Sequence, residues 1–328
     1  MSILARIAGI EKDTFGLDIG YQSIKVIQLK KAGVYFKLLS GGTIPSPRDP
    51  FAKGRVSHKK ELAAAIIKAV RDFHISAKAA ISALPESMVF TKIIRMPKMS
   101  ENELKNAVPL EAASFIPFEP AKTYIDFQIA DQYENSYETL VIAAQKTLVD
   151  DIIETFNLAN IELLCIETKP IANARALIMP KSQETVMILD VGARASSLTI
   201  CEDVTLKFTA TLSFGGRVFQ DIISNVSSPS GETELLNDNK AVLEILNTLS
   251  EKVLEGIKYY QGRKGKRTIS KILVVGGGAK MPGLAEHLTE KTKIKTELGN
   301  PWQLIKNPPK STDTLQATTA IGLAMRQL

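Results

Sequence analysis

One local pattern occurs twice in this chain: an apolar strand ends in an aspartate, a glycine turn follows, and a second strand carrying a hydroxyl side chain leads away. The two copies are residues 18–25 (DIGYQSIK) and residues 190–197 (DVGARASS). Such a turn can present backbone N–H groups to phosphate oxygens, while the neighbouring carboxylate holds magnesium, usually through water. Two copies, each opening a strand pair, indicate a duplicated domain whose turns face each other and hold a chain of phosphates from two sides.

Each copy taken alone also has a simpler interpretation. Because side chains alternate along a strand, Ser23 and Lys25 project to one face, where a hydroxyl and a cation would meet an anion together. The same spacing is typical of an ordinary tight hairpin with an exposed lysine. The phosphate interpretation of either turn therefore depends on the presence of both.

A third glycine motif follows a strand predicted over residues 271–275. Gly276, Gly277 and Gly278 stand between this strand and a helix expected over 284–291, and glycines at such a place let the backbone approach a flat ring or a ribose. The GxGxxG spacing is absent, and the surrounding elements do not form a Rossmann unit with its acidic residue about 20 positions onward. A dinucleotide site is therefore disfavoured.

The composition favours a globular protein of about two domains. The chain has 328 residues, of which 45% are hydrophobic and 23% charged, and a formal net charge of +6. Its apolar runs fall short of the roughly 18 to 20 residues that a membrane-spanning helix needs, and residues 1–10 lack a signal-peptide core. Cys165 and Cys201 have neither zinc-site nor disulfide spacing. We therefore expect a protein of the reducing cytoplasm.

Nucleic-acid binding is not expected. Basic residues cluster at 263–267 and 291–295, and neither cluster has an aromatic platform or a nucleic-acid signature beside it. Contact with an acidic membrane surface stays open.

The alternation of apolar runs with helical stretches favours the α/β or α+β class. A change of texture between about residues 85 and 163 indicates a small inserted α/β subdomain, and polar residues 227–239 and Pro-rich residues 301–309 indicate loops. Strands are expected at residues 15–19, 24–29, 79–83, 89–95, 124–130, 139–144, 186–189, 197–201 and 271–275. Helices are expected at residues 61–73, 100–114, 147–158, 241–260, 284–291 and 314–327, with a further helix after Gly216.

The three glycine motifs, in this order, resemble the actin, heat-shock chaperone and sugar-kinase ATPase superfamily. Within it the chain resembles the PilM family of actin-like proteins of type IV pilus assembly, which is related to the division protein FtsA. The likeness extends over almost the entire chain. It is carried by residues 16–25 (GLDIGYQSIK), 96–100 (MPKMS), 111–117 (EAASFIP), 189–193 (LDVGA), 214–216 (FGG), 276–284 (GGGAKMPGL) and 320–326 (AIGLAMR).

The resemblance implies an α/β, actin-like ATPase fold, built from duplicated ribonuclease-H-like domains, with an FtsA-type inserted subdomain. Lobe one would comprise residues 1–85 and 164–185, with residues 314–328 docking back onto it, and the insertion would comprise residues 86–163. Lobe two would comprise residues 186–226 and 268–313, with a small subdomain over 227–267. ATP and magnesium would bind between the lobes.

The resemblance also implies which residues contact the ligand. Asp18 and Asp190 would hold magnesium through water. On the long helix the family often has a glutamate followed by an arginine, whereas the aligned Lys252 and Glu255 carry these charges in the opposite order. The other expected contacts are Gly20, Tyr21, Gln22, Ser23, Lys25, Gly192, Ala193, Arg194 and Ser196 around the phosphates, and Gly215, Gly216, Gly276, Gly277 and Gly278 beside the nucleoside.

Glu167 is the candidate for a catalytic role, because a carboxylate in this connecting stretch could orient an attacking water. The alternative is a structural or solvent-facing carboxylate. Since no unambiguous base is visible, any hydrolysis of ATP would be slow.

In function, the resemblance implies an ATP-binding scaffold of the type IV pilus assembly platform, cytoplasmic and peripheral at the inner membrane. Its partner would be the cytoplasmic N-terminal peptide of PilN, an inner-membrane protein, bound near the inserted subdomain. Other pilus assembly proteins and self-association are further expected contacts, and membrane contact would run through partners.

Two alternatives stay open. A small-molecule kinase of the same superfamily would need a carboxylate that takes a proton from the acceptor hydroxyl, and no persuasive sequence for one is found. An FtsA-like division filament would usually end in an amphipathic membrane-targeting helix, whereas the terminal helix here is Ala-rich and weakly charged.

Overall fold

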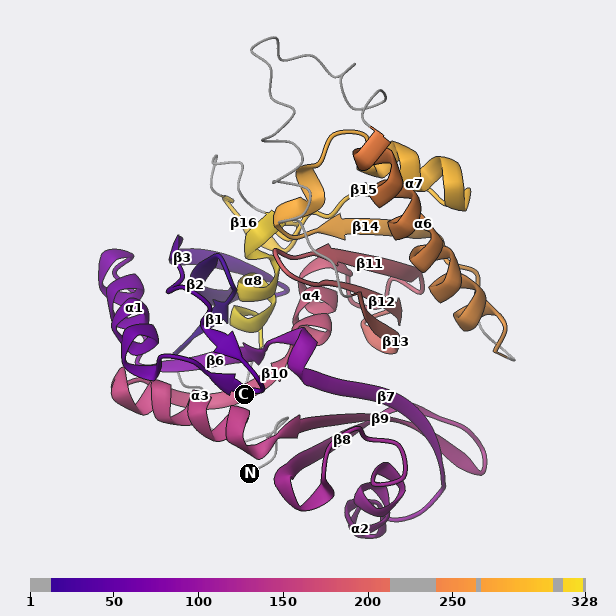
Figure 1. Ribbon diagram of the computed structural model, residues 1–328, viewed down its shortest axis with the longest axis horizontal. Coiled ribbons are helices and arrows are strands. Elements are labelled where there is room, and N and C mark those ends of the chain that lie inside the picture. The colour runs from indigo at the N-terminus through magenta and orange to yellow at the C-terminus, as the bar shows by residue number, and fades with distance from the viewer. Residues whose placement is uncertain (1–12, 213–239, 264–266, 309–314, 327–328) are drawn as a thin grey trace. The chain divides into compact units, whose positions relative to one another are not determined.

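The computed structural model describes residues 13–212, 240–263, 267–308 and 315–326 (Figure 1). The chain divides into two compact units. The first unit comprises Met1–Ala176, Trp302–Lys310 and Thr319–Leu328, and the second comprises Leu177–Pro301 and Ser311–Thr318. The chain therefore passes back and forth between the two units. The finer division expected from the sequence, with a separate small subdomain over residues 227–267, stays a prediction.

The first unit is built around a six-stranded sheet. Its strands are β1 (Thr14–Ile19), β2 (Ser23–Ala32), β3 (Tyr35–Pro45), β6 (Ala79–Leu84), β10 (Glu162–Thr168) and β16 (Ile305–Lys306). They lie in the order β10-β6-β1-β2-β3-β16. β1, β2 and β3 form an antiparallel meander. β6 and β10 lie on the other side of β1 and run parallel to it. β1 and β6 are buried along nearly their whole length, as is usual for central strands of α/β sheets.

The second unit contains a five-stranded sheet of the same design. Its strands are β11 (Thr185–Val191), β12 (Ser196–Glu202), β13 (Thr205–Leu212), β14 (Lys271–Val275) and β15 (Thr296–Leu298). They lie in the order β13-β12-β11-β14-β15, with an antiparallel meander followed by two parallel strands. The first sheet has the same order from β3 to β10. The predicted duplication is therefore confirmed by the topology of the two sheets.

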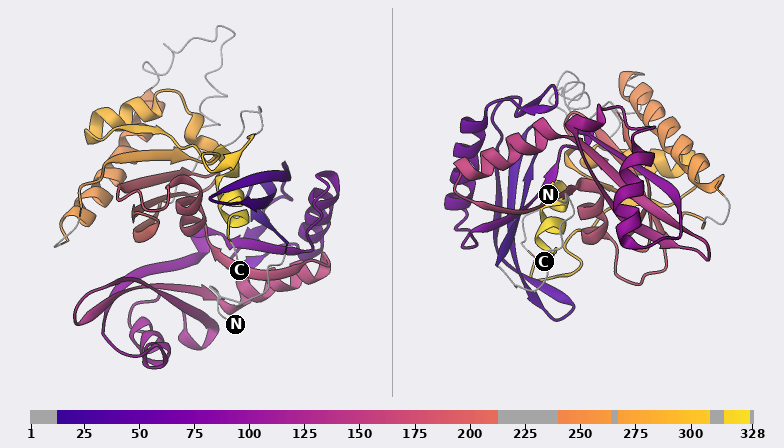
Figure 2. Two further views of the ribbon diagram at one scale, coloured as in Figure 1. Left: turned by 180° about the vertical axis from the view of Figure 1, so that it is seen from behind. Right: turned by 90° about the horizontal axis from the view of Figure 1, so that it is seen from below.

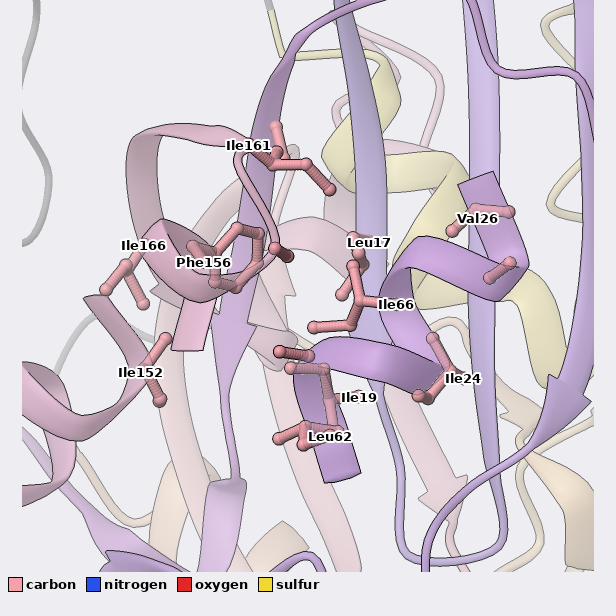
Figure 3. Packing of buried hydrophobic residues seen from close by; sticks show 14 of the residues in the cluster. Leu17, Ile19, Ile24, Val26, Leu62, Ile66, Ile152, Phe156, Ile161 and Ile166 are labelled. Atoms are coloured by element: carbon pink, nitrogen blue, oxygen red, sulfur yellow. The ribbon is translucent and has the colours of Figure 1, made fainter. Parts of the chain in front are cut away.

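Two helices back the first hairpin. The helices α1 (Lys59–Asp72) and α3 (Lys146–Leu158) contact each other. On α1, Leu62 and Ile66 recur at helical spacing on its buried face. They pack in one cluster with Ile152 and Phe156 of α3 and with Leu17 of β1 (Figure 3). Full burial of such a side chain contributes about 1.5–3 kcal/mol to stability. The cluster therefore stabilises the packing of the two helices on the β1–β2 hairpin.

The expected insertion forms its own small sheet. The strands β7 (Val89–Pro97), β8 (Thr123–Gln132) and β9 (Ser136–Gln145) lie in the order β7-β9-β8, and α2 (Glu101–Ala112) packs on them (Figure 2). Ser100 caps α2: its hydroxyl accepts from the Glu103 N–H while the Glu103 carboxylate accepts from the Ser100 N–H. Leu104 and Val108 of α2 belong to a core separate from that of the first sheet.

Several segments differ from the sequence-based expectation. Residues 146–163, expected within the insertion, contribute to the core of the first sheet, because the apolar face of α3 packs there. Residues 301–309, expected as a loop, contain β16, which pairs with β3. The terminal helix is shorter than expected, with a 3-10 turn over Leu315–Ala317 before α8 (Thr318–Ala324). The expected loop over 227–239 and the helix after Gly216 lie outside the described residues.

The remaining elements complete the two units. The second unit contains α6 (Lys240–Gln261) and α7 (Leu284–Thr292), both as predicted. The first unit contains α4 (Lys169–Leu177), which no pattern predicted, although its last residue belongs to the second unit. It also contains a small hairpin of β4 (Phe51–Ala52) and β5 (Arg55–Val56). Among the described residues, the helices are all too short or too polar to cross a membrane.

Candidate functional site

The first glycine turn joins β1 to β2 in a closed corner; residues 18–25 are called the first corner below. Asp18 lies opposite Lys25 in the antiparallel register. The Gly20 N–H donates to the Ser23 carbonyl at 3.0 Å. A Cβ at Gly20 would lie 2.9 Å from that carbonyl oxygen and 3.2 Å from the Lys25 ammonium. The closed turn therefore requires glycine, and the Lys25 ammonium lies beside it.

Asp18 is a buried carboxylate between two ammonium groups. Its residue is 2% exposed. The Lys169 Nζ lies 2.6 Å from Oδ1 of Asp18, and the Lys25 Nζ lies 3.6 Å from Oδ2. Burial raises the pKa of Asp18, but the charges of Lys169 and Lys25 outweigh it and hold that pKa below its ordinary value. Asp18 is therefore an anion held by two cations.

Lys169 is a site residue that the sequence analysis missed. β10 ends at Thr168, and Lys169 is the first residue of α4. Because β6 lies between β10 and β1 and all three run parallel, the end of β10 lies at the same edge of the sheet as Asp18. The Lys169 side chain thus reaches across the end of β6. A lysine between a strand and a proline at a helix start was the signal available in the sequence.

The second glycine turn joins β11 to β12; residues 190–197 are called the second corner below. Asp190 lies opposite Ser197, and a Cβ at Gly192 would lie 2.6 Å from the Ala195 carbonyl oxygen. This turn therefore requires glycine, as the first turn does. Ser196 is 1% exposed, and within the described part of the chain its hydroxyl has no hydrogen-bond partner. A buried hydroxyl in that state is available to a ligand.

The third glycine motif packs against the second corner. Gly276 has a φ of +88°, which favours glycine, and its N–H donates to the Leu315 carbonyl at 3.1 Å. A Cβ at Gly276 would lie 2.4 Å from Oδ1 of Asp190, and one at Gly278 would lie 2.4 Å from Cγ1 of Val191. The structure therefore brings the second and third motifs together within the second unit.

Gly277 differs from its two neighbours. It is exposed, and the nearest atoms to a Cβ there belong to the Gln316 side chain, at 3.8 to 4.0 Å. Its backbone thus faces open space at the carboxyl end of β14.

The other expected residues lie in varied settings. Tyr21 is half-buried, and its ring meets Phe51 edge-on. Lys252 and Glu255 form an exposed ion pair on α6 at 2.8 Å, so the two charges satisfy each other. Of the remaining set, Gln22 and Arg194 are exposed and Ala193 is half-buried. Gly215 and Gly216 lie outside the described residues.

Glu167 is completely buried and bound by two arginines. Arg175 donates to both carboxylate oxygens, at 2.7 and 2.9 Å, and Arg326 donates to Oε2 at 2.8 Å. It is therefore not solvent-facing. Of the roles considered for Glu167, this arrangement favours the structural one, because its oxygens are already committed to guanidinium groups.

No group of three or more His, Cys, Asp or Glu side chains within the described ranges could hold a metal. Asp18 belongs to the first unit and Asp190 to the second. Since the Asp18 oxygens face two ammonium groups, the donor set of the first corner does not fit magnesium in this arrangement. The cysteines offer no site either: Cys165 and Cys201 are buried, and burial raises the pKa of each to about 12.

Comparison with solved structures identifies the fold. A chain of a PilM–PilN type IV pilus biogenesis complex is 22% identical, with a TM-score of 0.83, over 96% of this chain and 98% of that one. The ethanolamine utilization protein EutJ from Carboxydothermus hydrogenoformans is 14% identical, with a TM-score of 0.53, over 98% and 92%. The cytoplasmic domain of EpsL, an inner membrane component of the type II secretion system of Vibrio cholerae, is 8% identical, with a TM-score of 0.52, over 95% of both chains.

These likenesses and the duplicated sheets establish the actin-like ATPase fold that the glycine motifs predicted. The sequence model of a family described as type IV pilus assembly protein PilM matches residues 16–328. The match includes both corners, the insertion and the third glycine motif. The chain therefore belongs to the PilM family of type IV pilus assembly proteins.

Proposed function

We propose that this chain is an ATP-binding scaffold of the pilus assembly platform at the inner membrane and that it binds the cytoplasmic N-terminal peptide of PilN. The observation that carries the proposal is the family match over residues 16–328, together with the likeness to a chain solved in a PilM–PilN complex. The chain would be cytoplasmic and reach the membrane through PilN. Other pilus assembly proteins and further copies of this chain are additional contacts of such a scaffold.

The nucleotide part of the proposal is supported by the glycine motifs. Both corners are closed turns at the ends of central strands, and the third motif lies beside the second corner. A glycine backbone at the carboxyl end of parallel strands is the usual place for a nucleotide in α/β proteins. The first unit offers a phosphate the Lys25 ammonium, and the second unit offers the Ser196 hydroxyl and the glycine backbone of the third motif. Magnesium does not fit the first corner as it stands, because two ammonium groups face the Asp18 oxygens.

Binding of a PilN peptide tests the scaffold function. A synthetic peptide with the N-terminal sequence of PilN, titrated into the full chain by fluorescence anisotropy, should bind saturably, whereas a scrambled peptide of the same composition should not. If both peptides bound equally well, the binding would not be specific for the PilN sequence, and the proposal that PilN is the partner would be wrong.

Two matched variants test the expected place of the peptide. Leu110 on α2 and Val34 between β2 and β3 are both apolar and 77% exposed, so that replacement by serine costs neither one buried contacts. If the peptide binds beside the insertion, Leu110→Ser should lower the affinity for the peptide and Val34→Ser should leave it unchanged. The opposite result would place the peptide on the first sheet instead.

A further inference from the structure

Three charged side chains converge at the first corner. Asp18, Lys25 and Lys169 come from β1, β2 and the start of α4, and the two ammonium groups lie 3.6 and 2.6 Å from the Asp18 oxygens. The Lys169 side chain is 18% exposed and the Lys25 side chain 11%. The three groups together carry one net positive charge, which lies beside the Gly20 turn.

The position of Lys169 is not explained by its own helix. As the first residue of α4 it places a cation at a helix N-terminus, where the macrodipole disfavours positive charge. The ion pair with Asp18 offsets this unfavourable interaction, and Lys169 in turn gives the buried Asp18 carboxylate a charged partner. One lysine of the sheet, Lys25, already lies opposite Asp18. The second lysine therefore brings the corner from neutral to positive.

This charge decides which ligand the corner accepts. A magnesium ion would be repelled by two ammonium groups, and the Asp18 oxygen that could hold its water already faces Lys169. A phosphate carries the opposite charge, and lysine binds phosphate as a point charge. The arrangement therefore favours the anion over the metal.

We propose that Lys169 is a phosphate-binding residue of the first corner and that, with Lys25, it supplies the positive charge that nucleotide sites commonly take from magnesium, so that ATP binds this chain without the metal. The inference rests on the proposed nucleotide function. It adds a binding residue to that site and changes the role of Asp18, which orients the two ammonium groups.

Calorimetric titration of the full chain with ATP tests the inference, in buffer with magnesium and in buffer with EDTA. The wild-type Kd should differ less than about threefold between the two buffers. Lys169→Gln should raise the Kd for ATP about tenfold in EDTA, as expected for the loss of one charge-assisted contact. Magnesium should restore part of this loss, because the Asp18 carboxylate is then released to hold the hydrated metal. Lys122→Gln, which removes an exposed lysine paired with Glu119, is the control and should bind as wild type.

A double variant separates folding from binding. Lys169→Gln alone leaves Asp18 with one cation less, so Asp18→Asn combined with Lys169→Gln replaces the buried pair by two neutral groups of similar size. This variant lacks the Lys169 ammonium but keeps the net charge of +1, so in EDTA it should bind ATP more tightly than Lys169→Gln alone, and magnesium should not strengthen its binding. Unchanged melting temperatures would show that each variant is folded.

The outcomes are distinct. If wild type binds ATP only with magnesium, or if Lys169→Gln binds as wild type in EDTA, Lys169 merely neutralises Asp18 and the inference is wrong. If wild type takes up no ATP in either buffer, the proposed nucleotide function fails, and this inference with it.

Discussion

Glu167 joins three segments of the first unit through one buried charge. Its carboxylate on β10 accepts from Arg175 on α4 and from Arg326 beyond α8, and Arg175 also donates to the Gly322 carbonyl at 2.6 Å. Desolvation of the three ions is costly, and only the complete set of contacts offsets it. The cluster therefore holds the terminal helix against the first sheet only while all three side chains are present.

Removal of this carboxylate should destabilise the fold strongly. Glu167→Gln leaves two guanidinium groups facing a neutral amide, and breaking a buried ion pair costs about 3–5 kcal/mol. Urea unfolding followed by circular dichroism measures the loss. Glu255→Gln, which breaks an exposed pair, should cost at most about 1 kcal/mol. A loss below that limit for Glu167→Gln would mean that the cluster contributes nothing to stability and would reopen a catalytic role.

Single residues were predictable where the signal is local. The two tight glycine turns follow from strands that end in an acid and a glycine, and a Cβ at Gly20 or Gly192 would indeed meet a backbone oxygen. The ligand contacts of Asp18, Gly20 and Gly192 stay a prediction. Lys169 was missed because its contact with Asp18 depends on strand order, which places β10 two strands from β1. The neighbouring sequence shows Lys169 only as a lysine between a strand and a proline, and it does not contain the strand order.

At the scale of elements, Asp151 ties three pieces of the first unit together. It lies on α3 and is 4% exposed. Its carboxylate accepts from Arg55 on β5 at 3.0 and 3.2 Å, from the Val56 N–H at 3.3 Å and from Lys59 on α1 at 3.2 Å. Burial raises the pKa of Asp151, but the hydrogen bonds from Arg55 and Lys59 outweigh it and hold that pKa below its ordinary value.

This shift predicts an acid-sensitive contribution to stability. Because the pKa of Asp151 is lower in the folded than in the unfolded chain, its contribution is complete above the ordinary value of 3.8 and is lost as the pH falls through the folded value. The free energy of unfolding of Asp151→Asn should therefore be lower than that of wild type at pH 7 and fall less steeply below pH 3.8. Asp150→Asn, which removes the adjacent exposed carboxylate, should keep the wild-type slope. Parallel curves for Asp151→Asn and wild type would contradict the assignment.

Elements were predictable where their apolar period is strong. The helices α1, α3 and α6 and the strands of both hairpins follow from such periods. β3 was missed because it is largely exposed and carries two glycines, and β16 because two residues gain strand character only from pairing with β3. The assignment of α3 to the insertion failed for a related reason: its apolar face shows that it packs, but not on which sheet.

At the scale of the molecule, the duplicated sheets place equivalent corners in two units, while the insertion interrupts only the first. In the proposed function, the corners and the third glycine motif would contact the nucleotide and the insertion would contact the peptide. Two sites on one chain become coupled only if the ligands shift a shared conformational equilibrium, and such coupling acts equally in both directions. ATP should therefore change the affinity for the PilN peptide by the same factor by which the peptide changes the affinity for ATP.

Gly277 provides the variant that tests this coupling. A side chain fits its open surroundings without displacing backbone, so Gly277→Leu should fold normally yet fill the space beside the glycine backbone. In wild type, saturating ATP should change the Kd of the peptide about fivefold or more. In Gly277→Leu the peptide should bind with the wild-type Kd measured without ATP and should no longer respond to the nucleotide. Gly277→Ala, which adds one methyl group at the same position, should respond as wild type. If the Kd of the peptide for wild type were the same with and without ATP, the nucleotide and the peptide would bind this scaffold independently.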